Sequence, residues 1–280
     1  MGEFIPIHPF QPTPVPKIGP KLLLLALAIL TVSARSITPA KPTPAGTRVS
    51  VVVIDPGHGG FDPGTHGKAI KEKNVALRIS LKLGASIEKN YPDVKVIYTR
   101  KDDRYLDLNE RAEIANRANA DLFICIHANS VGRPEVHGTE TYVMGLHRTE
   151  QNFEVSKREN SVMLLDSNYE EKYEGFDPSS PESYILFSLA QSAFQESSLK
   201  FAEKVENQFK TRAGRKSHGV KQAGFWVLWK TTMPSVLIET GFLTNPQEEL
   251  FLGSNDGQDA IAAAIFRAFR DYKTQMEAIN

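Results

Sequence analysis

Two histidines and two glutamates have the types and spacing of a metal-dependent catalytic site. His58 lies in DPGHGG, in the turn that follows an apolar run, and His127 in IHAN and Glu239 in IETG each come directly after an apolar run. Glu72 begins a segment with helical periodicity, shortly after the loop that carries His58. Two imidazoles, one carboxylate and a water complete a tetrahedral catalytic zinc site. A second carboxylate near the water can then act as a general base. The four residues therefore predict a hydrolytic metal centre.

Each of these residues also has a simpler explanation. A lone histidine in a glycine-rich turn, such as His58, is more often a turn residue than a ligand. Glu72 lies in a charged run that is typical of a solvated helix start. His127 and Glu239 are harder to explain in this way, because a polar group that ends an apolar run costs several kcal/mol to bury unless it is paired or metal-bound. The histidines in polar or loop contexts are taken as surface or supporting residues: His66, His137, His147 and His218.

The elements that would position these side chains alternate along the chain. Helical periodicity covers 75–88, a segment around 108–115, and 260–272. The alternation predicts an α/β fold, a single domain with a mostly parallel twisted sheet covered by helices on both faces. Carboxyl ends of parallel strands meet at one edge, so His58, His127 and Glu239 can lie close together. Strands are predicted at 49–55, 94–98, 122–127, 139–144, 224–229 and 235–239.

The first 48 residues differ in composition from the rest. Residues 1–34 predict a signal peptide: Lys17 and Lys21 precede an apolar run at 22–30, and small residues follow up to Ala34. The apolar run is shorter than the ~20 residues that span a bilayer, and the alternatives are a buried helix or an uncleaved anchor. Residues 35–48 predict a linker rich in proline and threonine. We therefore expect an exported protein with a catalytic domain at 49–275. This domain contains a polar insertion at about 145–187.

Charge and cysteine content exclude several classes of protein. The chain has 33 basic and 33 acidic residues, so no net charge attracts it to nucleic acid. A single cysteine, Cys125, forbids an intramolecular disulfide and a multi-cysteine zinc site. Any metal must therefore be held by histidine and carboxylate. Cys125 lies in an apolar run and is predicted to be a small buried residue.

Seven motifs occur in the order that is typical of one enzyme family. The chain resembles the zinc-dependent N-acetylmuramoyl-L-alanine amidases of the family that includes the bacterial cell-division amidases, over about 49–272. The motifs that carry the resemblance are DPGHGG at 55–60, EKN at 72–74, YTR at 98–100, LxxR at 108–111, AN at 115–116, IHAN at 126–129 and PSVLIETGFLTN at 234–245.

The resemblance implies a function for each of the four residues. It implies that His58, Glu72 and His127 bind Zn²⁺ and that Glu239 is the catalytic glutamate. The implied reaction is hydrolysis of the amide between N-acetylmuramic acid and the L-alanine of peptidoglycan, in cell-wall remodelling and daughter-cell separation. The implied location is the periplasm or the cell wall. We expect a monomer whose substrate partner is peptidoglycan.

The insertion contains a further candidate. Lys157-Arg158-Glu159-Asn160 resembles the start of a helix that, in regulated division amidases, blocks the active site with a glutamate on the metal. The resemblance makes Glu159 the candidate regulatory plug, released by an activator with a LytM-type domain as in related systems. The alternative is a solvated charge run, since the rest of the insertion departs from the family pattern.

The sequence also allows two alternative functions and suggests roles for two further residues. A zinc carboxypeptidase acting on stem peptides would carry a His-x-x-Glu ligand pair, but Phe61 stands third after His58. A non-catalytic cell-wall-binding protein would have lost ligands or base, whereas the set here is complete. Asn129 and Arg111 are predicted to position substrate or to brace the metal ligands. For Arg111, an exposed helix position paired with Asp107 is the alternative.

Overall fold

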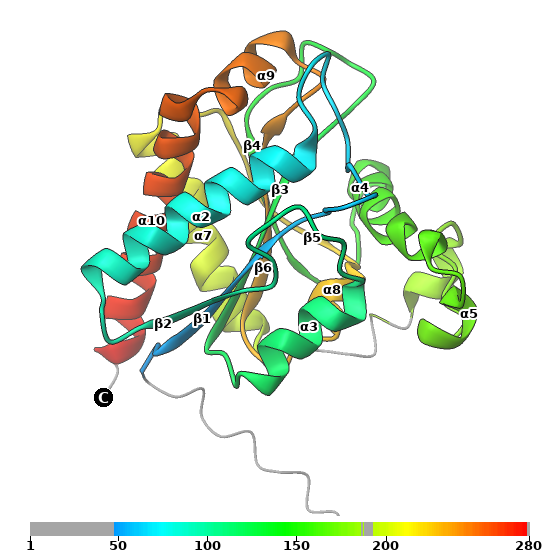
Figure 1. Cartoon of the computed structure of the whole chain (residues 1–280), viewed down its shortest axis with the longest axis horizontal. Coiled ribbons are helices and arrows are strands. Elements are labelled where there is room, and N and C mark those ends of the chain that lie inside the picture. The colour runs from blue at the N-terminus through cyan, green and yellow to red at the C-terminus, as the bar shows by residue number, and fades with distance from the viewer. Residues whose placement is uncertain (1–47, 186, 188–192, 279–280) are drawn as a thin grey trace, which may run out of the picture. The chain divides into compact units, whose positions relative to one another are not determined.

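The computed structural model describes residues 48–185, 187 and 193–278. Within these residues six strands form one sheet in the order β2-β1-β3-β6-β4-β5 (Figure 1). β1, β2, β3 and β6 are mutually parallel, while β4 runs antiparallel to β6 and parallel to β5. The predicted α/β fold with a mostly parallel sheet is confirmed. The strands are β1 (Val51–Pro56), β2 (Lys95–Tyr98), β3 (Leu122–Asn129), β4 (Thr139–Met144), β5 (Ser217–Ala223) and β6 (Ser235–Phe242).

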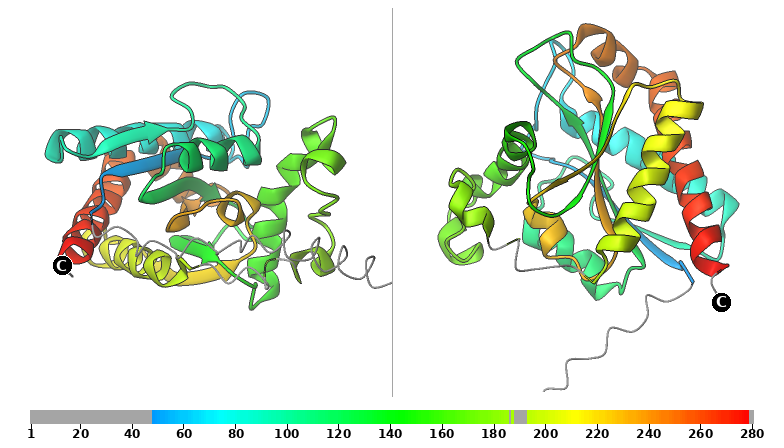
Figure 2. Two further views of the ribbon diagram at one scale, coloured as in Figure 1. Left: turned by 90° about the horizontal axis from the view of Figure 1, so that it is seen from below. Right: turned by 180° about the vertical axis from the view of Figure 1, so that it is seen from behind.

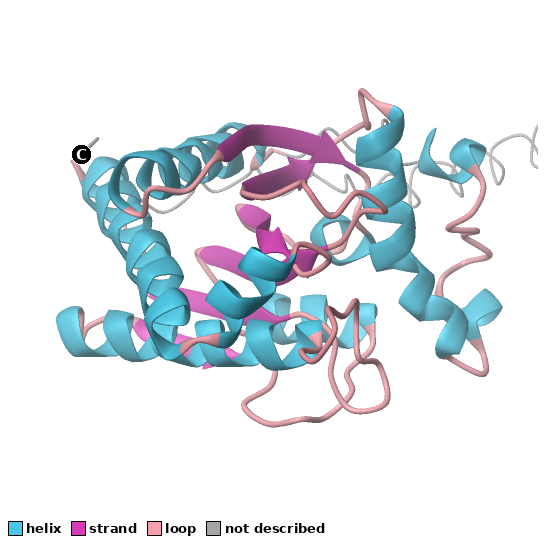
Figure 3. Cartoon of the chain, turned by 90° about the horizontal axis from the view of Figure 1, so that it is seen from above, coloured by secondary structure: helices cyan, strands magenta, loops and turns pink. Residues whose placement is uncertain are grey.

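Helices cover both faces of this sheet (Figure 2, Figure 3). On one face lie three long helices, α2 (Glu72–Asn90), α7 (Gln195–Arg212) and α10 (Asn255–Glu277). The opposite face is covered by α3 (Leu108–Arg117), α4 (Glu150–Asn160) and α8 (Trp226–Trp229). The short α9 (Pro246–Gly253) connects β6 to α10.

Alternating side chains of the central strands divide the core in two. Leu122, Ile124 and Ile126 of β3 pack on the face of the long helices. Phe123 and Cys125 pack on the opposite face, in a cluster that we call the second core. All eight residues of β3 are buried, because a parallel strand covered on both sides needs a continuous apolar run. The prediction that Cys125 is a buried residue is confirmed.

The prediction of a strand at 224–229 is wrong. The strand there is β5, at Ser217–Ala223, and Trp226–Trp229 form the single helical turn α8. β5 is a half-buried, largely polar edge strand, so it lacks the apolar run that marks a buried strand. The apolar run after it instead packs its aromatic side chains into the second core. Helix α7 was not predicted, although Phe201, Val205 and Phe209 carry its buried face at helical spacing.

The polar segment that predicted an insertion is largely structured. It contains α4, the 3-10 helix η1 (Ser161–Leu165), the single turn α5 (Tyr169–Lys172) and the 3-10 helix η2 (Pro181–Tyr184). Its aromatic residues Phe153, Tyr173, Phe176 and Tyr184 are buried in the second core. The predicted signal peptide and most of the predicted linker lie outside the described residues. In the described part of the chain no helix has the length and apolar character needed to cross a membrane.

A buried glutamate on α7 predicts a pH dependence of stability. Glu206 accepts hydrogen bonds from the hydroxyls of Thr139 (3.0 Å), Thr141 (2.6 Å) and Ser217 (2.5 Å). Burial nevertheless raises its pKa above the ordinary value of 4.5. The folded state therefore binds this proton more tightly than the unfolded chain does. The resulting contribution to stability is fully present below pH 4.5 and is lost as pH rises through the folded pKa.

We expect Glu206→Gln to lose less stability than the wild type between pH 5 and pH 8, because an amide cannot ionise. Urea unfolding at the two pH values measures the change in the free energy of unfolding. An identical change in both proteins would show that Glu206 does not titrate in this interval.

Candidate active site

The loop after β1 places His58 at the carboxyl edge of the sheet. His58 has φ of +58°, a left-handed conformation that is uncommon outside glycine and often found at functional sites. The loop also approaches β3 closely: a Cβ on Gly57 would lie 2.4 Å from the ring of His127. A glycine is therefore required before His58 for the two imidazoles to approach each other, with ring centroids 4.8 Å apart.

Two buried arginines hold this loop in place. Arg111 donates to Asp55 Oδ1 (2.9 Å) and to the carbonyls of Pro56 (2.8 Å) and His58 (2.8 Å). Arg100 donates to the Pro56 carbonyl at 3.0 Å. The alternative of an exposed Arg111 paired with Asp107 is wrong, since the side chain is buried and its partner is Asp55. Its guanidinium is used to brace the loop of His58.

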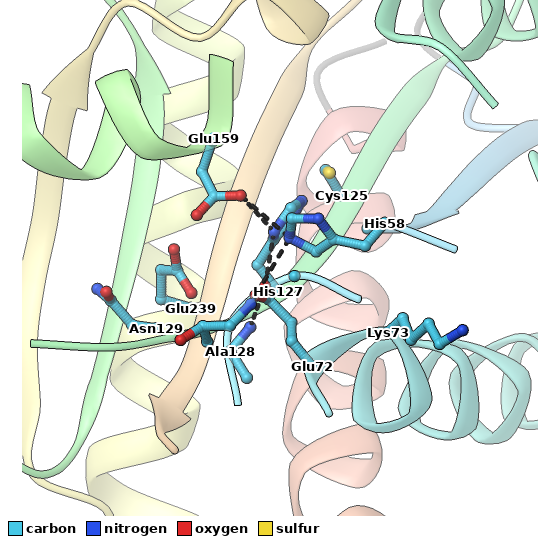
Figure 4. A network of polar contacts seen from close by, with 12 residues as sticks. His58, Glu72, Lys73, Cys125, His127, Ala128, Asn129, Glu159 and Glu239 are labelled. Carbon is cyan, nitrogen blue, oxygen red and sulfur yellow. Dashed lines mark hydrogen bonds and ion pairs between the residues drawn. The ribbon is translucent and has the colours of Figure 1, made fainter. Parts of the chain in front are cut away.

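Four ligand-type side chains converge beside this loop (Figure 4). His58, Glu72, His127 and Glu159 are all buried, and one ligand atom from each lies within 4.8 Å of the others. His58 Nε2 is 3.1 Å from Glu72 Oε2 and 3.2 Å from Glu159 Oε2. His127 Nδ1 is 2.9 Å from Glu72 Oε1 and 3.1 Å from Glu159 Oε2. The structure thus brings together three predicted ligands from a loop, a helix start and a strand end, and adds Glu159 from α4.

Hydrogen bonds orient two of these side chains. Glu72, the first residue of α2, accepts the backbone N–H groups of Ala128 at Oε1 (3.0 Å) and Thr65 at Oε2 (2.8 Å). His58 Nδ1 lies 2.7 Å from Asp62 Oδ2, so its Nε2 faces the cluster. Sequence reasoning missed Asp62, for which the only signal was a carboxylate four residues after His58.

Glu239 lies beside the cluster. It stands opposite His127 in the pairing of β6 with β3. The residue is fully buried, and neither carboxylate oxygen has a hydrogen-bond partner among the described residues. Burial raises the pKa of Glu239 well above its usual value, and the negative charge of Glu159 adds to this rise. Glu239 is therefore a buried carboxyl group that holds its proton more tightly than a solvated glutamate does.

Helix α4 carries two adjacent charged residues into the site. Only 5% of Glu159 is exposed, so the alternative of a solvated charge run is wrong for this residue. Its pKa stays well below the usual value: burial opposes ionisation, but the charges of Arg158 and His127 outweigh it. Arg158 contacts Glu159 Oε1 at 2.9 Å, donates to Asn129 Oδ1 at 3.0 Å and lies 3.6 Å from Glu239 Oε1. Sequence reasoning assigned no function to Arg158.

The donor set fits a divalent metal. His58 Nε2 and Glu159 Oε2 are buried without a hydrogen-bond partner in the described structure, which is costly unless another group satisfies them. Imidazole nitrogens with carboxylate oxygens are typical zinc ligands. The cluster is therefore a candidate metal site. The remaining histidines of the described chain, which are exposed or half-buried, lie outside it: His66, His137, His147 and His218.

An α/β sheet with a buried histidine and glutamate cluster at its carboxyl edge, and a separate buried glutamate beside it, defines a metal-dependent hydrolase. The family model of N-acetylmuramoyl-L-alanine amidase matches residues 52–271. The chain belongs to the N-acetylmuramoyl-L-alanine amidase family, and the resemblance found in its motifs is confirmed.

Curated relatives and solved structures agree with this family. The amidase AmiA of Escherichia coli K12 is 32% identical over 225 residues, which cover 79% of this chain and 75% of AmiA. The structure of the amidase AmiC2 of Nostoc punctiforme is 32% identical with a TM-score of 0.59, covering 80% of this chain and 96% of that one. An amidase structure from Clostridium difficile 630 is 27% identical with a TM-score of 0.61, covering 80% and 97%.

Proposed function

We propose that this protein hydrolyses the amide bond between the lactyl group of N-acetylmuramic acid and the first L-alanine of the peptidoglycan stem peptide. The observation that supports it is the position of Glu239 next to the cluster of His58, Glu72 and His127, in a chain of the amidase family. The neighbouring strands β3 and β6 hold these groups at one edge of the sheet, so a single scissile bond can meet all of them.

His58, Glu72 and His127 would hold Zn²⁺. When bound, zinc supplies Lewis acidity that polarises a carbonyl oxygen and lowers the pKa of water. The chain contributes the orientation of the ligands: Asp62 holds the ring of His58, and the backbone N–H groups of Thr65 and Ala128 hold Glu72. Arg111 braces the loop from which His58 projects.

Glu239 would transfer the proton. It accepts one proton from the attacking water as the new carbon–oxygen bond forms. It then returns that proton to the alanine nitrogen as the carbon–nitrogen bond breaks. The products are the lactyl carboxylic acid and a stem peptide with a free amino terminus. The raised pKa of the Glu239 carboxyl, caused by its burial, favours a group that takes up and releases a proton in this way.

Helix α4 would close this site in the structure described. Glu159 stands between the two imidazoles, where a water or the substrate carbonyl would otherwise lie. A cavity of about 20 Å³ lies beside His58, His127 and Glu159, and it has room for about one water. Activity therefore requires α4 to move, and we propose that an activator protein displaces it.

Export follows from the substrate, since peptidoglycan lies outside the cytoplasmic membrane. We propose that residues 1–34 act as the signal peptide and that the enzyme works in the periplasm or at the cell wall.

The function is tested by mass spectrometry of muropeptides released from purified sacculi, using the wild type and Glu159→Ala with and without a chelator. An amidase releases intact stem peptides that begin with alanine, a carboxypeptidase shortens the peptides, and a binding protein releases nothing. We expect intact peptides, loss of release on chelation and recovery with added zinc. Equal release by metal-stripped protein would contradict the assignment.

A further inference from the structure

A buried polar network lies behind Asn129, away from the metal ligands. Glu140 on β4 is fully buried and pairs directly with Glu239 across the antiparallel strands. Its Oε2 accepts hydrogen bonds from Asn129 Nδ2 (3.2 Å) and the Tyr142 hydroxyl (2.7 Å), and its Oε1 lies 2.5 Å from Lys221 Nζ. An ionised carboxylate only accepts hydrogen bonds. Asn129 must therefore turn its NH₂ group toward Glu140.

This contact fixes the polarity of the Asn129 amide. Asn129 Oδ1 points the other way, where it accepts from the backbone N–H of Ser130 (2.7 Å) and from Arg158 Nη2 (3.0 Å). Both neighbours on this side only donate, so the orientation of the amide is set from both ends. The active site therefore presents a carbonyl oxygen at this point, next to Glu239 (Figure 4).

Arg158 fills the space in front of this oxygen. Its guanidinium also donates to the Ser130 carbonyl at 3.1 Å and lies 3.6 Å from Glu239 Oε1. Asn129 is the last residue of β3, Ser130 follows it, and Glu239 lies on β6. Arg158, in contrast, lies on α4. When α4 moves, these acceptors lose the guanidinium of Arg158, and Asn129 Oδ1 keeps only the backbone N–H of Ser130 as a donor. A ligand that enters here displaces water from these acceptors, and it must bring N–H or O–H groups because an acceptor buried without a donor is costly.

We propose that Asn129 Oδ1 and the Ser130 carbonyl form a subsite for a backbone N–H group of the stem peptide, that Glu140 is the positioning residue for it, and that Arg158 occupies it when α4 is closed. The identity of the ligand rests on the proposed function, because the stem peptide is the part of the substrate that supplies backbone N–H donors. Lys221 and Tyr142 hold Glu140, and Glu140 in turn holds the amide of Asn129. Helix α4 thus covers the metal ligands with Glu159 and the peptide subsite with Arg158.

The test is binding of the dipeptide L-alanyl-D-glutamate to the zinc-loaded full chain, measured by calorimetry. Arg158→Met removes the competing guanidinium, and we expect it to bind the dipeptide about tenfold more tightly than the wild type. Adding Glu140→Gln to this variant lets the Asn129 amide turn over, because the new side chain can donate as well as accept. We expect that second change to cancel the gain. An analogue methylated at the amide nitrogen between the two residues should bind both variants equally weakly.

A matched control is Glu206→Gln in the Arg158→Met background. Glu206 is a buried glutamate of α7 that accepts a hydrogen bond from Thr141 of β4, the strand that carries Glu140. Its replacement should leave dipeptide affinity unchanged. In hydrolysis assays Glu140→Gln should raise KM about tenfold and change kcat far less, which a general loss of stability would not do. If Glu140→Gln does not fold, Tyr142→Phe removes one hydrogen bond to Glu140 and should weaken binding in the same direction.

Two results would overturn the subsite: Arg158→Met binds the dipeptide no better than the wild type, or the methylated analogue binds as tightly as the dipeptide. Failure of the proposed function has a different signature. In that case no stem peptide is released from sacculi, whatever the dipeptide affinities are.

Discussion

Replacement of Glu239 by glutamine is expected to lower kcat for stem-peptide release by about 10³, within the range of 10² to 10⁴ that general acid–base catalysis contributes. The amide keeps the size of the side chain but cannot take a proton from water or return one to the leaving nitrogen. Because Glu239 is not a member of the four-residue cluster, the zinc content should not change. Assays are best made on the Glu159→Ala background, in which the site is open.

The matched control is again Glu206→Gln, which replaces a buried glutamate of α7 outside the four-residue cluster and should keep its activity. Metal analysis and circular dichroism check that the Glu239 variant is loaded and folded. A folded, zinc-loaded Glu239→Gln protein whose kcat lies within tenfold of its parent would remove Glu239 from the mechanism.

The second large effect is expected from Glu159→Ala, which should raise basal hydrolysis of sacculi by about 10². The estimate assumes that the closed form holds about 99% of the molecules, so that opening the rest multiplies the active population a hundredfold. The physical reason is that alanine removes the carboxylate that lies 3.2 Å from His58 Nε2 and 3.1 Å from His127 Nδ1. It also leaves Arg158 without its partner Glu159 Oε1.

Glu154→Ala provides the control on the same helix. Glu154 is exposed and makes a 3.7 Å ion pair with Lys157, so its loss should leave basal activity unchanged. Unchanged or lower basal activity in a folded Glu159→Ala protein would argue against the plug. Release of stem peptides is measured with the same assay for both variants.

Much of the fold could be predicted because its signals are local. The run at 122–126 is apolar at every position, which is the pattern of a strand covered on both faces. The prediction of a strand at 224–229 is wrong for the converse reason. Trp226 and its neighbours are apolar because they fill the core between the sheet and the insertion, and not because they form a strand. β5 itself is half-buried at the sheet edge and has no such run.

The candidate site could be predicted in the same partial way. His58, Glu72 and His127 follow from residue types at a loop, a helix start and a strand end, and their proximity follows from the parallel order of β1, β3 and β6. The direction in which a side chain points does not follow from such patterns. Arg111 could equally have faced solvent, and only the packed structure turns it toward Asp55 and the loop of His58.

By itself, the sequence determined which chemical groups this protein has at the ends of its strands, because apolar runs and the residues that end them are properties of a few consecutive positions. Only the tertiary structure decided which of those groups meet. Asp62 with His58, Arg158 with Asn129, and Asn129 with Glu140 are pairs of side chains that packing brings within hydrogen-bond distance. Burial also raises the pKa of Glu239, since the cost of an ion depends on its surroundings and not on its position in the chain.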